Sequence, residues 1–215
     1  MTIELLVFDL DGTLVDSRKD ILNAVNHTLS SLGLPQMPAE EIINHVGWGA
    51  SNLVRSVLGE GHQHFFKKAM PLFKAFYAEH LLDNTVLYPG VRELIESVEF
   101  PKTVCTNKPT EFSVKILEGL GVAGFFAMIS GGDRFAVKKP APDALHALAQ
   151  GAGVPLEKVL MIGDSVIDIE AGKNAGAKTC AVTYGFGQRE DLVRANPDYI
   201  LDSITEVKGI LKQRR

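Results

Sequence analysis

The sequence predicts an α/β fold: a doubly wound parallel sheet that carries an inserted helical domain. Three observations lead to this prediction. Short apolar runs recur along the chain, helical patterns separate the later runs, and a helical stretch of roughly 90 residues follows the first run, far more than a strand-to-helix crossover needs. Strands that alternate with helices form parallel sheets with helices on both faces.

The expected strands are short runs rich in aliphatic residues, typical of strands buried on both faces of a parallel sheet. They are Leu5–Asp9, Thr103–Thr106, Ala127–Ser130, Val159–Asp164, Thr179–Val182 and Tyr199–Leu201. The helices expected between them are Val91–Val98, Glu111–Leu120, Asp143–Ala152 and Val166–Ala175.

The long interval after the first strand is expected to form a separate helical domain. Its helical patterns are Ser17–Leu32, Ala39–His45, Ser51–Leu58 and His62–Leu82, with glycine- and proline-containing breaks between them. We therefore predict a sheet domain of residues 1–16 and 84–215 and an inserted domain of residues 17–83. An insertion at this point would lie over the crevice at the strand ends and act as a lid.

Composition excludes several classes of function. The 215 residues are 46% hydrophobic and 22% charged, with a net charge of −4, which argues against nucleic acid as the main partner. No apolar stretch is long enough to span a bilayer, and the first strand starts too early for a signal peptide. Cys105 and Cys180 lie in apolar runs and are expected to be buried free thiols. We expect a cytoplasmic protein, a monomer or homodimer, without a membrane partner.

The first expected strand ends in two acids followed by a turn, Asp9-Leu10-Asp11-Gly12-Thr13. Asp9 is placed to attack an electrophile, and Asp11 to donate a proton to a leaving oxygen and then activate water. Gly12 permits a tight bend, and Thr13 offers a hydroxyl and backbone N–H groups to a phosphate oxygen. An ordinary Asp-Gly turn with solvated acids is the alternative explanation.

Two further segments place polar groups after apolar runs. Thr106 and Asn107 end the second strand and are suited to holding a phosphoryl oxygen, although such residues also cap helices. Lys139 follows Lys138 and precedes Pro140, where a lysine beside carboxylates would offset their repulsion and orient a nucleophile. A solvated basic pair before a helix is the alternative.

The fourth segment, Gly163-Asp164-Ser165, ends another apolar run and is followed by Asp168. Asp164 is a hard oxygen ligand suited to Mg²⁺, with Asp168 as a supporting partner, although Asp164 and Ser165 are also plausible helix caps. All four segments fall at or just past strand ends. If each segment were only a turn, a helix cap or a solvated charge pair, four unrelated features would have to coincide at one edge of the sheet. Together the four segments therefore favour a functional site.

Over its whole length the chain resembles the haloacid dehalogenase superfamily, whose four motifs look like these four segments and whose helical cap follows the first motif. The resemblance implies a Rossmann-like core with Asp9 as nucleophile and Asp11 as acid/base. It implies that Thr106 and Lys139 hold the phosphate and the nucleophile. It further implies Mg²⁺ bound by Asp9, Asp164 and the backbone carbonyl of Asp11.

Within the superfamily, Asp9–Ser17, Val46–Ala50 and Gly163–Ser165 look most like phosphoglycolate phosphatases. A halide leaves without protonation, so Asp11 favours a phosphate ester over a carbon–halogen bond. The resemblance therefore implies a Mg²⁺-dependent phosphatase that forms an aspartyl phosphate, with 2-phosphoglycolate as the best single substrate. The alternatives are a pyrophosphatase, a sugar phosphatase or nucleotidase, a phosphomutase, and a non-catalytic regulator that binds a phosphorylated metabolite.

Specificity is expected to come from the inserted domain, whose closure would favour a small phosphorylated metabolite. Trp48, between two glycines, is a candidate for lining the substrate pocket or for packing in the domain core. Arg55 is a candidate for a substrate carboxylate or for a solvated helix face. The histidines show no zinc-binding spacing.

Overall fold

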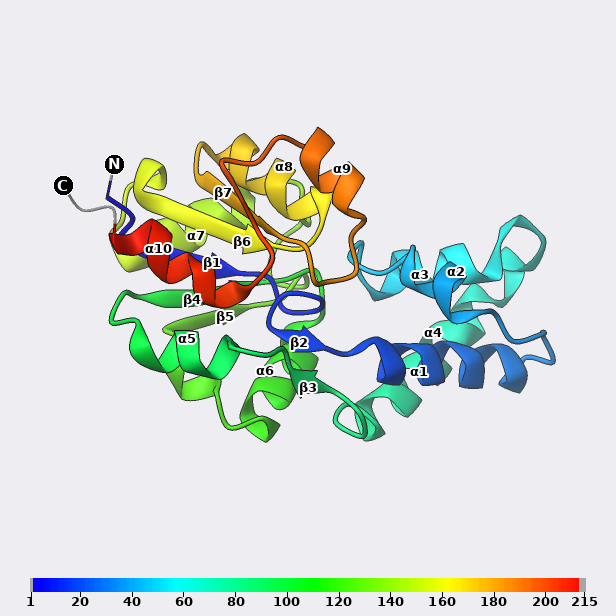
Figure 1. The fold of residues 1–215 in the computed structure, drawn as a ribbon. Helices are drawn as coiled ribbons and strands as arrows, with labels where there is room; N and C mark the ends of the chain where they lie inside the picture. Colours follow the sequence, from blue (N-terminus) through cyan, green and yellow to red (C-terminus); the bar gives the residue numbers. More distant parts are fainter. Residues whose placement is uncertain (1, 213–215) are drawn as a thin grey trace.

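The computed structural model describes residues 2–212 and contains a six-stranded parallel sheet (Figure 1). Its strands are β1 (Leu5–Phe8), β4 (Lys102–Cys105), β5 (Met128–Ser130), β6 (Val159–Gly163), β7 (Lys178–Val182) and β8 (Tyr199–Leu201). The order β5-β4-β1-β6-β7-β8 puts β1 near the centre, between β4 and β6. The predicted α/β class is confirmed, and each strand agrees with its predicted range to within one residue at either end.

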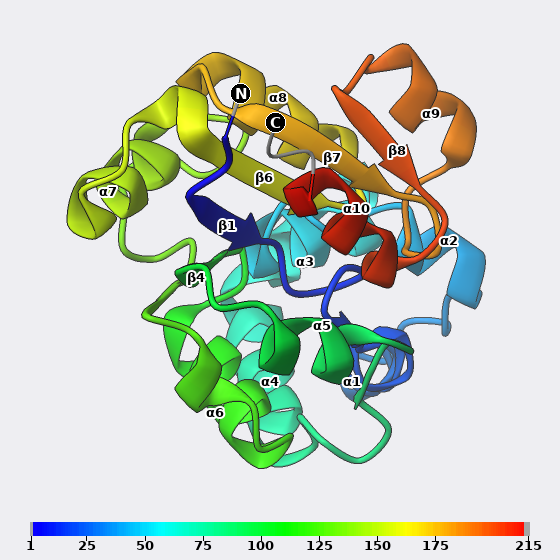
Figure 2. The ribbon, with the colours of Figure 1, turned by 60° about the vertical axis from the view of Figure 1, so that its left-hand side comes forward.

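Helices cover both faces of the sheet, as Figure 2 shows for α5 and α6 on one side and α7 and α8 on the other. The helices of this part are α5 (Val91–Ser97), α6 (Thr110–Gly119), α7 (Asp143–Ala152), α8 (Val166–Ala175), α9 (Arg189–Arg194) and α10 (Val207–Lys212). Side chains of β1 alternate between the faces: Leu6 and Phe8 join the cluster of α5 and α6, and Leu5 and Val7 join that of α7 and α8.

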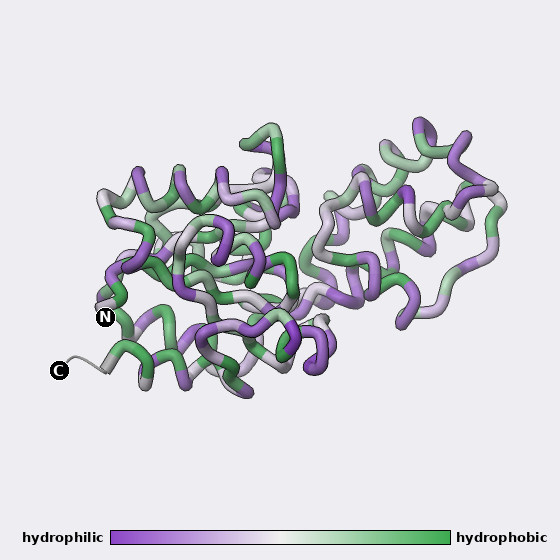
Figure 3. Tube along the Cα trace, turned by 90° about the horizontal axis from the view of Figure 1, so that it is seen from above, coloured by the Kyte–Doolittle hydropathy of each residue, from purple (hydrophilic) through white to green (hydrophobic). Residues whose placement is uncertain are grey.

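Four helices form a body beyond the carboxyl ends of the strands (Figure 1). They are α1 (Arg18–Ser31), α2 (Ala39–Ile43), α3 (Ala50–Leu58) and α4 (Phe66–Glu79), with a 3₁₀ turn over Glu60–Phe65. Helices α1 and α4 pack together through Ile21, Val25 and Phe73, and hydrophobic and hydrophilic residues alternate along this body in Figure 3. None of the helices within residues 2–212 has the length and apolar character needed to cross a membrane.

Two short chain segments join the helical body to the sheet. β2 (Val15–Asp16) and β3 (Val86–Leu87) pair antiparallel, which the sequence analysis did not predict. Beside them, fully buried Asp20 accepts hydrogen bonds from the backbone and side chains of Asn84 and Thr85 at 2.7–3.0 Å. This contact ties the outgoing segment to the returning one.

Candidate active site

The polar segments that follow the strands meet at one edge of the sheet. Asp9 follows β1, Thr106 follows β4 and Asp164 follows β6, and these three strands are neighbours. Lys139 lies on the loop between β5 and α7. The structure therefore brings residues separated by more than 150 positions into one site, at the central strands of the sheet.

Lys139 is buried between two carboxylates. Its Nζ donates to Asp9 Oδ1 at 2.8 Å and to Asp168 Oδ1 at 2.6 Å. Burial lowers the pKa of Lys139, but the charges of Asp168 and Asp9 outweigh burial and raise it well above its usual value. Lys139 therefore remains a cation and holds Asp9 in a fixed orientation. Lys138, its neighbour, makes neither contact.

Three buried carboxylates form a candidate cation site. One oxygen from each of Asp9, Asp164 and Asp168 lies within 4.8 Å of the others. Burial raises the pKa of Asp9 to about 6, against the lowering effect of Lys139, and raises the pKa of Asp164 to about 8. Both oxygens of Asp168 are already engaged, one by Lys139 and the other by the backbone and hydroxyl of Ser165. The carboxylate oxygens of this cluster are hard ligands of the kind that fits Mg²⁺.

Thr13 and Gly12 shape the surroundings of Asp164. The Thr13 hydroxyl, which the sequence predicted as a phosphate ligand, donates to Asp164 Oδ1 at 2.9 Å. The backbone N–H of Phe186 donates to the other oxygen at 2.7 Å. Gly12 has a φ of 90°, and a Cβ there would lie 2.1 Å from Asp164 Oδ2. A side chain at position 12 would therefore displace the carboxylate as well as strain the backbone.

Thr106 and Asn107 both lie at the buried end of β4. Thr106 Oγ1 accepts a hydrogen bond from the backbone of Lys108 at 3.2 Å. The Asn107 side chain accepts from the Lys139 backbone N–H and donates to the carbonyls of Lys139 and Gly47 at 2.9–3.0 Å. The sequence predicted Asn107 as a substrate-binding residue, and its side chain joins the Lys139 loop to the helical body.

Asp11 is held by residues that the sequence analysis did not assign to the site. Ser17 Oγ donates to Asp11 Oδ1 at 2.6 Å, and Lys108 Nζ lies 2.9 and 3.0 Å from the two carboxylate oxygens. Lys108 also donates to Tyr77 Oη at 2.6 Å. Lys108 belongs to the same strand-end run as Thr106, and this position in the sequence could have identified it as a site residue. No sequence pattern could have identified Tyr77, because an aromatic residue on an amphipathic helix is typical of core packing.

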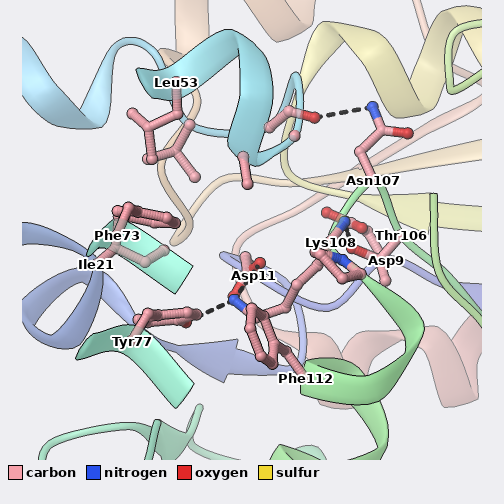
Figure 4. Close-up of a pocket in the computed structure, with 15 residues that line it drawn as sticks. Asp9, Asp11, Ile21, Leu53, Phe73, Tyr77, Thr106, Asn107, Lys108 and Phe112 are labelled. Carbon is pink, nitrogen blue, oxygen red and sulfur yellow. Dashed lines mark hydrogen bonds and ion pairs between the residues drawn. The ribbon is translucent and has the colours of Figure 1, made fainter. Parts of the chain in front are cut away.

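A small cavity of about 50 Å³ lies between the sheet and the helical body (Figure 4). Its wall combines polar residues of the strand ends with apolar residues of the helices: Asp9, Asp11, Thr106, Asn107, Lys108, Phe112, Ile21, Leu53, Phe73 and Tyr77. Since one water needs about 10–15 Å³ of such volume, only a small group fits this space.

A second, more open cavity of about 210 Å³ is lined by Asp9, Asp11, Asp164 and Trp48, among others. Trp48 is 46% exposed, so it borders this outer cavity and is not packed in the helical core. Arg55 lies with its guanidinium 3.8 Å from the ring centre of Phe66 and lines neither cavity.

The haloacid dehalogenase-like hydrolase family matches residues 6–182. A phosphoglycolate phosphatase of Vibrio parahaemolyticus is 38% identical over 219 residues, covering 97% of this chain and 96% of the relative. One from Chromobacterium violaceum is 37% identical, covering 98% and 97%. The solved structure of a predicted phosphoglycolate phosphatase from Haemophilus somnus 129pt superposes with a TM-score of 0.93 at 30% identity, covering 98% of each chain.

The family match spans most of the chain, and the relatives are similar over nearly its full length. The family and enzyme class predicted from the sequence are confirmed. This chain belongs to the haloacid dehalogenase-like hydrolase family and is a phosphoric monoester hydrolase.

Proposed function

We propose that this protein is a Mg²⁺-dependent phosphatase that hydrolyses a small phosphate monoester, 2-phosphoglycolate, through an aspartyl phosphate on Asp9. The observation that carries the proposal is the position of Asp9. It lies beside Lys139 and near Asp164, where it borders the small cavity beneath the helical body. The substrate is inferred from the names of the similar proteins.

Asp9 is the proposed nucleophile. Lys139 binds its Oδ1, which leaves Oδ2 to attack phosphorus in line with the leaving oxygen. Thr106, Lys139 and backbone N–H groups at the strand ends stabilise the oxygens of the transferring phosphoryl group. Phosphoryl transfer depends chiefly on positioning and electrostatics of this kind.

Asp11 is the proposed acid and base. It protonates the leaving alkoxide as the aspartyl phosphate forms, and it then accepts a proton from the water that hydrolyses this intermediate. Its hydrogen bonds from Ser17 and Lys108 fix the carboxylate beside the cavity.

Mg²⁺ is the cation that the donor set fits best. Asp9 and Asp164 would hold it through their carboxylates, and Asp11 through its backbone carbonyl. When bound, Mg²⁺ would neutralise charge on the phosphoryl oxygens and keep the buried carboxylates ionised.

Residues 17–83 are proposed to act as a cap domain over a sheet domain of residues 1–16 and 84–215. Closure of the cap would exclude water from the small space beside Asp9 and Asp11. Trp48, which lines the outer cavity, is placed to contact a substrate there.

Phosphate release from a panel of esters tests this proposal. The panel contains 2-phosphoglycolate, pyrophosphate, sugar phosphates and nucleoside monophosphates, each with Mg²⁺ and with EDTA. The expected result is a kcat/KM for 2-phosphoglycolate far above the others, abolished by EDTA. Mg²⁺-dependent preference for another ester would refute the substrate but not the chemistry. Transfer of the phosphoryl group to a second sugar hydroxyl would favour a phosphomutase, and absence of all turnover would favour a regulator.

A further inference from the structure

Lys108 and Tyr77 were not predicted as site residues, yet Lys108 is buried against the proposed acid/base and Tyr77 is buried against Lys108. We propose that they are positioning residues. Lys108 holds the carboxylate of Asp11 from the sheet, and Tyr77 holds Lys108 from the helical body. Asp11 is therefore aligned for proton transfer only while the helical body is closed on the sheet. This inference rests on the acid/base role of Asp11 in the proposed function.

The hydrogen-bonding capacity of Lys108 is fully used. An ammonium group has three N–H donors, and Nζ has three acceptors within reach: both oxygens of Asp11 and the hydroxyl of Tyr77. The side chain is only 5% exposed, and its charge also lies 4.6 Å from the centre of the Tyr77 ring. In this closed arrangement Lys108 orients Asp11 and has no donor left for substrate.

Tyr77 carries this contact across the boundary between the two bodies. It belongs to α4, where it stacks on Phe73 at 5.6 Å, and it meets Phe112 of α6 edge-on, also at 5.6 Å. Figure 4 shows its hydroxyl directed at the amine of Lys108, with Asp11 beside that amine. If α4 moved away from the sheet, Lys108 would lose one of its three partners.

The two oxygens of Asp11 are not equivalent in this arrangement. Oδ1 accepts from both Ser17 and Lys108, whereas Oδ2 accepts from Lys108 alone among the side chains of residues 2–212. Oδ2 therefore keeps more free acceptor capacity than Oδ1.

The test separates the proton-dependent step from the rest of catalysis. Tyr77→Phe keeps the ring contacts and removes the hydroxyl, and Lys108→Met keeps the length of the side chain and removes its charge. Tyr199→Phe on edge strand β8 and Lys158→Met, paired with Glu4 away from the site, are the matched controls. Rapid-quench experiments measure the first phosphoryl transfer with 2-phosphoglycolate, whose alkoxide needs a proton, and with 4-nitrophenyl phosphate, whose phenolate leaves without one.

We expect the first transfer from 2-phosphoglycolate to slow about tenfold in Tyr77→Phe and about 10²-fold in Lys108→Met, because misplacing a catalytic group by roughly 1 Å has effects of this size. KM and the transfer from 4-nitrophenyl phosphate should change by less than about twofold, and the double variant should be no slower than Lys108→Met, as expected for residues that act as a unit. Both control variants should match the unmodified protein.

Equal slowing with both substrates, or no slowing, would overturn the inference. If Lys108→Met fails to fold, Tyr77→Phe alone decides between these outcomes. Asp11→Asn identifies which claim has failed. If Asp11→Asn does not slow the first transfer from 2-phosphoglycolate more than the transfer from 4-nitrophenyl phosphate, the acid/base role in the proposed function is wrong. If Asp11→Asn shows this selective slowing and the other two variants do not, only the positioning role is wrong.

Discussion

At the scale of single residues, the position of the proposed nucleophile depends on a buried cation. Lys139 offsets the charges of Asp9 and Asp168, which otherwise would repel each other in a poorly solvated place. The sequence left open whether Lys138 or Lys139 had this position, although the resemblance favoured Lys139. The structure places the ammonium of Lys139 between the two acids.

Lys139→Met should therefore lower the free energy of unfolding by about 3–5 kcal/mol, because removing one partner leaves buried carboxylates without their counter-charge. Lys138→Met is the matched control and should change stability by less than about 0.5 kcal/mol. Urea unfolding of both variants measures the difference. Similar losses in the two variants would show that the charge balance at Asp9 does not depend on Lys139.

The raised pKa values of Asp9 and Asp164 predict an unusual pH dependence in EDTA. The ordinary pKa of an aspartate is 3.8, whereas in the folded protein the pKa of Asp9 is about 6 and that of Asp164 is about 8. Between the ordinary pKa and these raised values, the folded protein binds more protons than the unfolded chain. The contribution of this pair to stability should then fall as pH rises from about 4 to 8. Thermal unfolding in EDTA across this range should show a downward slope that is shallower in Asp164→Asn.

Added Mg²⁺ should counteract this slope, because the cation binds the ionised carboxylates and so stabilises the folded protein most at high pH. An identical slope in Asp164→Asn would mean that other groups cause the effect. No response of the unmodified protein to Mg²⁺ would argue against a cation site at Asp9 and Asp164.

At the scale of elements, the sequence predicted the sheet better than the connections. The strands are continuous apolar runs because both faces of the sheet are covered, and such runs are easily recognised. The pairing of β2 with β3 involves two residues on each side and leaves no pattern in the sequence. The start of α4 was also misplaced, since Glu60–Phe65 forms a 3₁₀ turn before it.

The connection between the two bodies provides a further prediction. Asp20→Ala would leave the two buried donors of Thr85, its backbone N–H and its hydroxyl, without their acceptor, which should lower the free energy of unfolding by about 1–3 kcal/mol. Asp83→Ala removes a neighbouring but exposed carboxylate, paired with His80, and should have little effect. Denaturant unfolding of both variants tests this. An unchanged stability in Asp20→Ala would show that the contact does not contribute to holding the two segments together.

At the scale of the whole molecule, the candidate site could be predicted only in part. The ends of neighbouring parallel strands must meet, so the approximate convergence of Asp9, Thr106 and Asp164 followed from the fold class. The contact of Tyr77 with Lys108 depends on how the helical body packs on the sheet. That packing is a tertiary property, and the spacing of residues along α4 does not encode it.

The central claim is that the phosphoryl group passes through Asp9, and one measurement tests it most directly. Asp11→Asn, mixed with 4-nitrophenyl phosphate and Mg²⁺, should form the intermediate without needing an acid but hydrolyse it slowly for want of a base. We predict a burst of one nitrophenolate per active site and a phosphoryl group on the peptide that contains Asp9, found by acid quench and mass spectrometry. The variant that also carries Asp9→Asn should show neither. Phosphorylation of a different residue, or turnover without any phosphorylated enzyme, would contradict the account.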